Sequence, residues 1–321
     1  MPLPILLLRK RKLRHSLGRP SRSDFVQLTF DDTISPTGGS NLVYGYQRLE
    51  TPSTASVRQI NAEYSPNEAK RTKCTASPVI LGGSFQIDRV IAQTSGAINE
   101  MDFQIKEKTK AGANYFHNLV INGTSAASGT GYVPNTFDGL KKILSGKSTE
   151  MTTNIDISTS ALLDSNYNAL LDELDTFIAL LAAKPDVLMM NSKMLTKVKS
   201  AARRAGYYDR NKDDFGRTVE TYNGIILMDA GQYYNGSTTE DVVSTSTPSS
   251  DAYGTTDIYA AKLGLDAFHG ISVDGSKMLK TYLPDLQAPG AVKTGEVELI
   301  AGAVLKNSKM AGVLKGIKLL R

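Results

Sequence analysis

The clearest pattern of apolar and polar positions along the chain predicts a long amphipathic helix over residues 96–119. Apolar residues recur there at steps of three, four or seven and form one narrow stripe on a mainly charged segment. The stripe consists of Ile98, Met101, Ile105, Gly112, Tyr115 and Leu119. At 1.5 Å per residue, such a helix would be roughly 35 Å long. Because its polar face is wide, we expect the helix to lie across a sheet rather than inside a bundle.

A second helical pattern covers residues 160–183 and opens a run of alternating elements. Its apolar side chains again recur at steps of three and four, and Lys184-Pro185 ends it. The next segment, DVLMMN, predicts a buried strand, and a third helix is expected from Ser192 to about residue 205. The segment YNGIILMDA predicts another core strand. This alternation is typical of an α/β block.

Residues 56–94 are predicted to form a long two-stranded hairpin. Ser65–Glu68 carries the turn signal, and the expected tip bears Lys70, Arg71 and Lys73. A hairpin this polar has little apolar surface to bury against its own domain. We therefore expect it to project outward and to contact another chain, with these three basic residues as candidate inter-subunit contacts.

Other segments complete the expected organisation. Residues 23–55 are rich in Ser, Thr, Pro and Gly and predict an extended arm. Residues 231–257 form a polar loop without a core-forming pattern, and its Tyr233 and Tyr234 are candidate inter-subunit contacts. The C-terminal third predicts several strands that complete a sheet begun earlier. We expect the long helix and these last strands to share one domain, with the α/β block as an insertion.

The net charge of +5 is unevenly distributed along the chain. Seven basic and no acidic residues occur in residues 1–22, and five basic and no acidic residues occur in 299–321. The middle of the chain is therefore acidic overall. The N-terminal segment could be an interfacial helix, a nucleic-acid-binding arm, an arm that orders on a neighbouring subunit, or a removable leader. Its candidate contacts to a shell lumen or a neighbour are Arg9, Lys10, Arg11, Lys12 and Arg14.

The residue types that carry catalysis or bind metals do not form a recognisable pattern. The single cysteine, Cys74, excludes an intramolecular disulfide and a Cys-rich zinc site. His15, His117 and His269 are far apart in sequence and form no HExxH motif. No apolar run reaches the roughly 18 residues that a membrane span requires. We predict no catalytic residue, no cofactor, no metal site and no membrane contact.

A glycine-rich stretch, NGTSAASGTGY, resembles a phosphate-binding loop only superficially. It lacks the Lys-Ser/Thr pair of a Walker A loop and the third glycine of a dinucleotide-binding fingerprint. It also follows a predicted helix, whereas both motifs connect a strand to a helix. We interpret its glycines as a joint between two domains.

Several passages in this order resemble the major capsid protein of tailed bacteriophages, which has the Hong Kong 97-type fold. SFQIDRVIAQTSG followed by INEMDFQIKEKTKAGANYFHNLVINGT resembles the hairpin exit and spine helix of that family. FDGLKKIL, KPDVLMMNSKMLTKVKSAAR and NGIILMDA resemble passages that follow in its axial domain. The resemblance covers about residues 40–320.

The resemblance implies an α+β, Hong Kong 97-like capsid fold with four parts. Residues 1–55 would be an N-terminal arm, and residues 56–94 an extended β-hairpin loop. Residues 95–134 and 266–321 would form a peripheral domain with the long spine helix. Residues 135–265 would form an inserted axial α/β domain, whose loop near 231–257 would meet its copies at the five- and six-fold vertices.

The resemblance also implies a function and a set of partners. The chain would be a structural protein, not an enzyme, that assembles into pentamers and hexamers of a virion capsid. Its partners would be a separate scaffolding protein, a portal protein, a decoration protein and non-specifically bound double-stranded DNA. Assembly would take place in the cytoplasm of the host bacterium. Some relatives crosslink a hairpin lysine to an asparagine, and Lys70 or Lys73 with Asn307 has the residue types for this, without an identifiable catalytic glutamate.

Two alternatives remain at this point. An encapsulin uses the same fold to enclose a cargo enzyme inside a cell, and neighbouring genes would distinguish it from a phage protein. A soluble enzyme built on the α/β block would be a monomer or small oligomer, whereas a capsid protein would form capsomers or megadalton shells.

Overall fold

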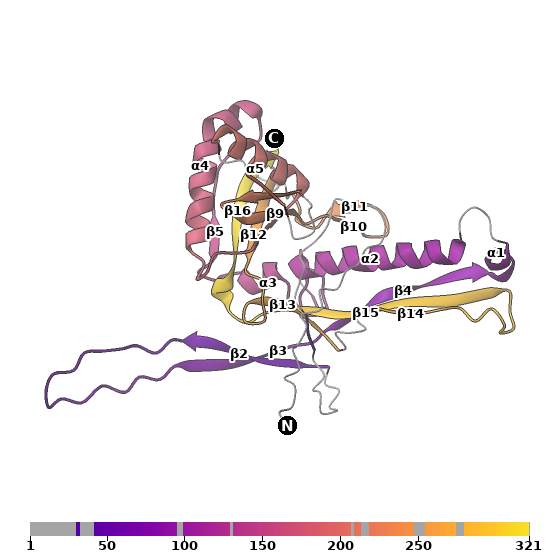
Figure 1. The fold of residues 1–321 in the computed structure, drawn as a ribbon, viewed down its shortest axis with the longest axis horizontal. Coiled ribbons are helices and arrows are strands. Elements are labelled where there is room, and N and C mark those ends of the chain that lie inside the picture. Colours follow the sequence, from indigo (N-terminus) through magenta and orange to yellow (C-terminus); the bar gives the residue numbers. More distant parts are fainter. Residues whose placement is uncertain are drawn as a thin grey trace, which may run out of the picture.

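The computed structural model describes residues 30–32, 42–94, 99–128, 131–206, 209–212, 218–246, 254–273 and 279–320. Figure 1 shows three parts that extend in different directions from a central region. A two-stranded hairpin reaches out on one side, and a layer of helix on sheet extends on the opposite side. A second sheet with two helices rises between them. The fold is α+β, as the sequence predicts.

The first sheet is organised around one 14-residue strand, β15. It has the order β1-β13-β15-β14, and β4 also pairs with β15, antiparallel over ten residues from Val79 to Asp88. Its strands are β1 (Phe30–Asp32), β4 (Val79–Asp88), β13 (Phe268–Ser272), β14 (Leu279–Tyr282) and β15 (Val292–Leu305). The short helix α1 (Arg89–Gln93) follows β4 directly.

The predicted long helix is confirmed as α2 (Glu100–Asn122), which lies along β4 and β15. The Asn99 side chain accepts hydrogen bonds from the amides of Met101 and Asp102 and so caps the N-terminus. The β4 strand alternates, and its buried side chains are Leu81, Phe85 and Ile87. The C-terminal half of α2 enters a first hydrophobic core together with α3 (Leu140–Leu144).

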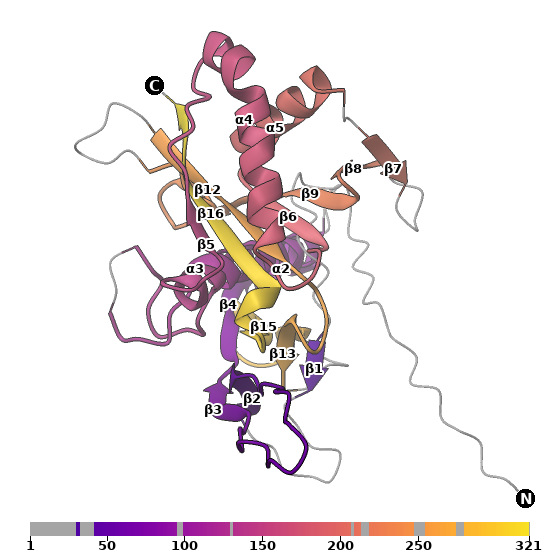
Figure 2. The same ribbon diagram turned by 90° about the vertical axis from the view of Figure 1, so that its left-hand side faces the viewer.

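The second sheet has seven strands in the order β5-β16-β12-β6-β9-β8-β7. The strands are β5 (Glu150–Thr152), β6 (Val187–Met190), β7 (Asp209–Lys212), β8 (Thr218–Tyr222), β9 (Ile225–Asp229), β12 (Gly254–Ala261) and β16 (Ala311–Leu320). Helices α4 (Ser160–Ala179) and α5 (Ser192–Arg204) pack on it over a second core (Figure 2). These helices and the strands β6 and β9 confirm the predicted α/β block.

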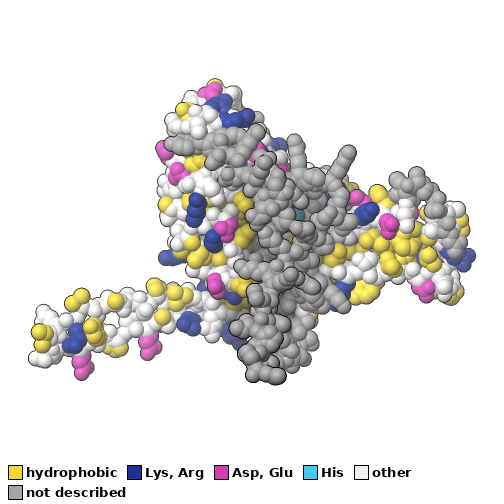
Figure 3. Space-filling view, in the orientation of Figure 1, with side chains coloured by type: hydrophobic (Ala, Val, Ile, Leu, Met, Phe, Trp, Pro, Cys, Tyr) yellow, Lys and Arg dark blue, Asp and Glu magenta, His cyan; other side chains and the backbone are white. Residues whose placement is uncertain are grey.

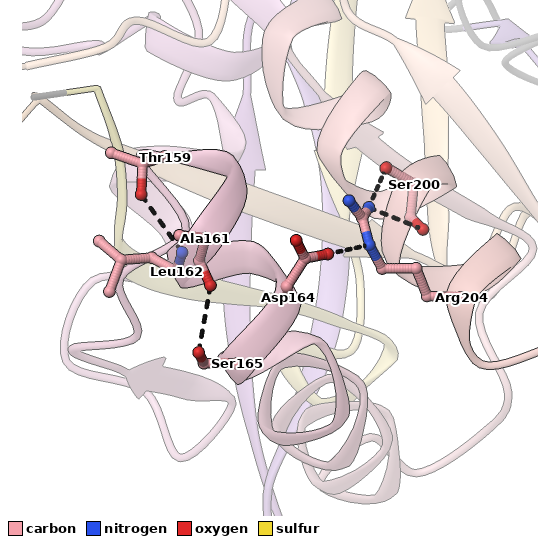
Figure 4. A network of polar contacts seen from close by, with 7 residues as sticks. All are labelled: Thr159, Ala161, Leu162, Asp164, Ser165, Ser200 and Arg204. Carbon is pink, nitrogen blue, oxygen red and sulfur yellow. Dashed lines mark hydrogen bonds and ion pairs between the residues drawn. The ribbon is translucent and has the colours of Figure 1, made fainter.

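The helices α4 and α5 are joined by polar contacts as well as by the core (Figure 4). The Nε atom of Arg204 lies 2.6 Å from an oxygen of Asp164, and the same guanidinium donates to the hydroxyl of Ser200. The Thr159 side chain accepts from the amide of Leu162 and caps α4. Because Asp164 is more than half exposed, we expect this ion pair to contribute less than the apolar contacts beneath it.

The position of the last strand differs from the expected grouping of residues 266–321. Strand β16 does not join β13, β14 and β15 but pairs with β12 and β5 in the seven-stranded sheet. Its Leu314, Ile317 and Leu319 are buried in the second core. A short 3-10 helix, Ser308–Met310, carries the chain from one sheet to the other. Pairing between distant strands has no local signature, which explains the difference.

The hairpin also differs from the prediction in its strands and its turn. It consists of β2 (Tyr44–Thr51) and β3 (Lys70–Ala76), so its first strand comes from the segment expected to be an arm. The turn lies at Ile60 and Asn61, not at Ser65–Glu68. A second, small hairpin, β10 (Gln232–Tyr234) and β11 (Thr239–Asp241), forms within the predicted polar loop and packs against α2.

The close pairing of β4 with β15 makes Gly82 a sensitive position. A Cβ atom at Gly82 would lie 2.0 Å from the carbonyl oxygen of Val297, whereas one at Gly112 in α2 would meet nothing within 4 Å. We expect Gly82→Ala to lower the free energy of unfolding by about 1–3 kcal/mol. The matched Gly112→Ala should raise it by about 0.5–1 kcal/mol because alanine favours a helix interior. Urea unfolding of the two variants tests this, and equal stabilities would contradict it.

Candidate functional site

The β2–β3 hairpin is the part of the described chain that is least covered by the rest. Residues 51–73, which run from the end of β2 through the turn into the first half of β3, are all exposed. The tip closes through a hydrogen bond from the amide of Ala62 to the carbonyl of Gln59, with Asn61 in the left-handed region at φ 66°. The hairpin can therefore meet another molecule along most of its length.

The tip is apolar, although the sequence suggested a basic one. Val57 and Ile60 are 100% and 91% exposed, and Tyr64 is also exposed. The guanidinium of Arg58 lies 5.5 Å from the centre of the Tyr64 ring and donates to the carbonyl of Ala62 at 3.1 Å. These contacts hold the tip in one shape while its large apolar side chains remain in water, which is unfavourable for an isolated chain.

The base of the hairpin is fastened to the body through one face of β2. Tyr44, Tyr46 and Arg48 alternate with exposed residues and are half-buried. Arg48 donates to the carbonyl of Leu305 at the end of β15, at 2.9 Å. The Tyr44 ring meets the edge of His269 with centroids 5.8 Å apart. Burial raises the pKa of Tyr46, and the neighbouring Arg48 partly offsets this.

The three predicted basic contacts lie on the hairpin but not at its tip. Lys70, Arg71 and Lys73 are exposed at the start of β3. Arg71 approaches the side chain of Gln47 on the opposite strand, at 3.4 Å. These residues leave the hairpin with an uncovered basic strand between its anchored base and its apolar tip.

The predicted tyrosines lie elsewhere, on the β10–β11 hairpin beside α2. The hydroxyl of Tyr233 donates to Glu240 at 2.8 Å, and its ring lies 6.3 Å from that of Tyr115. Burial, followed by the Glu240 carboxylate, raises the pKa of Tyr233 to about 12. Tyr234 is exposed and bonds only locally, to the carbonyl of Gly236. Tyr233 thus has partners within its own chain, whereas the ring of Tyr234 is available to a neighbour.

The remaining predicted residues, Arg9, Lys10, Arg11, Lys12 and Arg14, lie outside the described residues. Sequence reasoning missed the anchor residues Tyr44, Tyr46 and Arg48, although their alternation in YGYQRLE was a usable signal. It also missed the apolar tip. Figure 3 shows hydrophobic side chains along the hairpin and again at the far end of the helix-on-sheet layer. Within that layer, the exposed large apolar residues include Val90, Ile91, Phe103, Leu283 and Val292, and we call these five residues the end patch.

Gly123, which begins the glycine-rich stretch, and Gly139, which follows it, are closely packed. A Cβ atom at Gly123 would lie 2.5 Å from the carbonyl oxygen of Phe137, and one at Gly139 would lie 2.6 Å from that of Ile121. The amide of Gly139 bonds to the carbonyl of Gly123 at 3.0 Å. These two glycines allow backbone segments to pack closely against the end of α2. Gly129 of the stretch lies outside the described residues, so the interpretation of the stretch as a joint stays a prediction.

The described residues show no arrangement typical of a metal site. Within that part of the chain, no three His, Cys, Asp or Glu side chains come together as a metal ion would need. None of its helices is long and apolar enough to cross a membrane. The candidate site is therefore a set of surfaces, which are the hairpin, the end patch and the exposed ring of Tyr234.

Comparisons with known proteins agree on the kind of protein. Residues 68–226, about half of the chain, match the family model described as SU10 major capsid protein. The chain is similar in structure to the holo-SrpI encapsulin complex from Synechococcus elongatus PCC 7942, with 12% identity, a TM-score of 0.63, and coverage of 92% of this chain and 86% of that one. No curated protein sequence is significantly similar.

Two further similar structures come from a phage and from the capsid of a GTA particle. A protein of Mycobacterium phage Bobi has 12% identity and a TM-score of 0.57, with 94% of this chain and 92% of that chain covered. The capsid of a native GTA particle has 13% identity and a TM-score of 0.53, with coverage of 95% and 96%. At these identities the structures establish the shared fold, and the family match supplies the class of protein.

The anchored base of the hairpin can be tested in the unassembled chain. We expect Arg48→Met to lose the hydrogen bond to Leu305 and to speed amide hydrogen exchange of residues 44–49 about fivefold, equivalent to about 1 kcal/mol. The matched Arg71→Met changes an arginine on the opposite, exposed side. It should leave exchange at these amides unchanged, and similar effects of the two variants would show that Arg48 is not an anchor.

Proposed function

We propose that this chain, a shell-forming major capsid protein with the Hong Kong 97-like fold of tailed bacteriophages, assembles chiefly through its projecting hairpin. The observation that supports this is the combination of an anchored base and an exposed tip. The base fixes the direction of the hairpin, and the tip exposes Val57, Ile60 and Tyr64 to solvent. Preorganised apolar side chains of this kind favour binding because little conformational freedom is lost.

The second copy of the chain is the natural partner for this hairpin. A shell consists of many copies in repeated contacts, so an apolar surface on one copy requires a complementary surface on another. The hairpin tip and the end patch are apolar, and they extend in opposite directions from the body (Figure 1). Each contact need contribute only modestly, because many contacts act together in a closed shell.

We assign the parts of the chain by their cores and their sheets. The arm would be the segment before the hairpin, and the hairpin would comprise β2 and β3. The peripheral domain would comprise β4, α1, α2 and the strands β13 to β15. The axial domain would comprise residues 135–265 together with β16, because β16 pairs with β12 and contributes to the second core. Tyr234 and the loop around it would contact neighbouring copies.

Several finer features follow from the same proposal. The subunits would form pentamers and hexamers, guided by a separate scaffolding protein, with a portal protein at one vertex and a decoration protein outside. Assembly would occur in the cytoplasm of the host bacterium. The basic segment that contains Arg9 to Arg14, rich in charge and free of acids, would contact packaged double-stranded DNA or an acidic neighbour.

An encapsulin-type shell is the second candidate, and one observation favours it. The encapsulin complex has a TM-score of 0.63 to this chain, above that of either particle protein described above. We favour the phage class because the family model recognises sequence, whereas fold similarity at 12% identity does not distinguish the two uses of the fold. A portal or terminase gene beside the coding sequence would support the phage class, and a gene for a cargo enzyme would support the encapsulin.

The hairpin tip can be tested by sedimentation of the purified chain. We expect the triple variant Val57→Ser, Ile60→Ser and Tyr64→Ser to keep the unfolding midpoint of the wild type, since these side chains contact solvent. Its assembly should require at least about tenfold more protein, because burial of each side chain contributes about 1.5–3 kcal/mol.

The matched control replaces three polar residues of the same exposed segment, Gln59→Ser, Glu63→Ser and Glu68→Ser. It should assemble at about the wild-type concentration. Normal assembly of the apolar-tip variant would refute the proposed role of the tip, and a lowered unfolding midpoint would show that the tip also stabilises the monomer.

A further inference from the structure

A cluster of titratable side chains lies where the seven-stranded sheet meets α3 and the glycine-rich stretch. At its centre is Asp257 on β12. The pairing of β12 with β16 passes from Thr256 opposite Ile317 to Ile258 opposite Leu314, so Lys315 and Gly316 both lie opposite Asp257. This is a β-bulge, a feature that re-aims side chains next to functional positions.

The bulge requires a glycine at position 316. Its φ of +83° is in the left-handed region, and a Cβ atom there would lie 2.7 Å from the carbonyl oxygen of Thr153. Its amide donates to the carboxylate of Asp257 at 3.3 Å. The carboxylate of Asp257 is largely shielded from solvent at this place, and it accepts from the Gly316 amide and from the hydroxyl of Tyr259.

The groups around Asp257 lie on β16, β5, α3, the glycine-rich stretch and β12 itself. On β16 and β5, Lys315 forms an ion pair with Glu150 at 2.5 Å. On α3, Lys141 donates to the carbonyl of Gly131 at 3.1 Å, and its ammonium group lies 5.3 Å from the centre of the Tyr132 ring. On β12 itself, the buried Tyr259 directs its hydroxyl to the carboxylate of Asp257, and burial followed by this carboxylate raises the pKa of Tyr259.

The cluster lies on the side of the sheet that faces the first core. Tyr259 and Val313 both belong to that core, and Val313 is the strand partner of Glu150. Helix α3 contributes the buried Leu140 and Leu144 to the same core and Lys141 to the cluster. Figure 2 shows α3 beside β5, β16 and β12. The cluster therefore lies where the seven-stranded sheet meets α3 and the first core.

We propose that Asp257 is a proton-operated switch at this joint, which is tighter when the carboxyl group is protonated and looser when it is ionised. The ionised form places a charge in a shielded bulge, where its donors are the distant Gly316 amide and the neutral Tyr259 hydroxyl. Glu150 repels this charge, and the two nearby lysines already have other partners. The protonated form removes that cost and leaves the Glu150–Lys315 pair intact. The inference goes beyond shell formation and is independent of it, because it concerns the isolated chain.

The direction of the pH effect follows from the pKa shifts. Burial raises the pKa of Asp257 above 3.8, against the opposing effects of Gly316, Lys315 and Lys141, whereas Glu150 raises it further. The stability that Asp257 contributes is then complete below pH 3.8 and is lost as the pH rises through the raised value. The hydrogen bond from Lys315 lowers the pKa of Glu150, so its contribution is present above pH 4.5 and is lost as the pH falls.

The test compares thermal unfolding of the full chain and its Asp257→Asn variant between pH 3.5 and pH 8. The effect of Glu150 is common to both and cancels in the difference. We expect the variant to gain stability relative to the wild type as the pH rises through the raised pKa of Asp257. At neutral pH, amides of residues 140–144 and 315–317 should exchange more slowly in the variant, and below pH 3.8 this difference should vanish.

The matched control is Asp172→Asn on the exposed side of α4, which removes a carboxylate outside the cluster and should leave the exchange of residues 140–144 and 315–317 as in the wild type. A pH-independent difference for Asp257→Asn would overturn the proposal. If that variant does not fold, Lys141→Met serves instead. It removes a nearby positive charge and should shift the drop in wild-type stability to higher pH, and an unchanged profile would equally overturn the proposal.

Discussion

The two sheets of this protein depend on one continuous segment, residues 292–320. Its first strand, β15, lies at the centre of one sheet, and its second strand, β16, lies inside the other. Only the short stretch Lys306–Met310 separates them. Strand β15 contributes buried side chains to the first core, and β16 contributes to both cores, so neither core can form fully without fixing the other in place. The close approach at Gly82 arises where β4 pairs with β15, and the bulge at Gly316 arises where β16 pairs with β12.

A body held together in this way can support long extensions that have little stability of their own. The hairpin projects because its polar strands have no core to join, and Tyr44 and Arg48 fasten its base to β13 and β15. The sheet therefore determines where the hairpin points. A two-stranded ribbon with an apolar tip is unfavourable in an isolated chain but suits a protein whose final state is a shell. A second contact fixes the relative position of two parts of the body. It lies around Asp257, where the seven-stranded sheet meets α3.

Local patterns in the sequence predicted the three long helices and the buried strands of the α/β block. Periodicity identified α2 and α4, and runs of apolar residues identified β6 and β9, because these elements bury one face or both. Signals at its two ends identified α5. The sheet partner of β16 could not be found in this way, since pairing between distant strands leaves no local trace. Strand β2 was missed because its surroundings are rich in Ser, Thr, Pro and Gly. The turn at Asn61 was missed because Ser65–Glu68 has the more familiar turn composition, and the apolar tip was missed with it.

The central claim is that the chain assembles into a shell through the projecting hairpin. Electron cryo-microscopy of the purified full-length chain tests it most directly. The account predicts closed shells in which the hairpin of each copy extends from the body as it does here and rests its Val57, Ile60 and Tyr64 on a neighbouring copy. Discrete monomers or small oligomers would contradict the account, as would shells in which these three side chains face solvent.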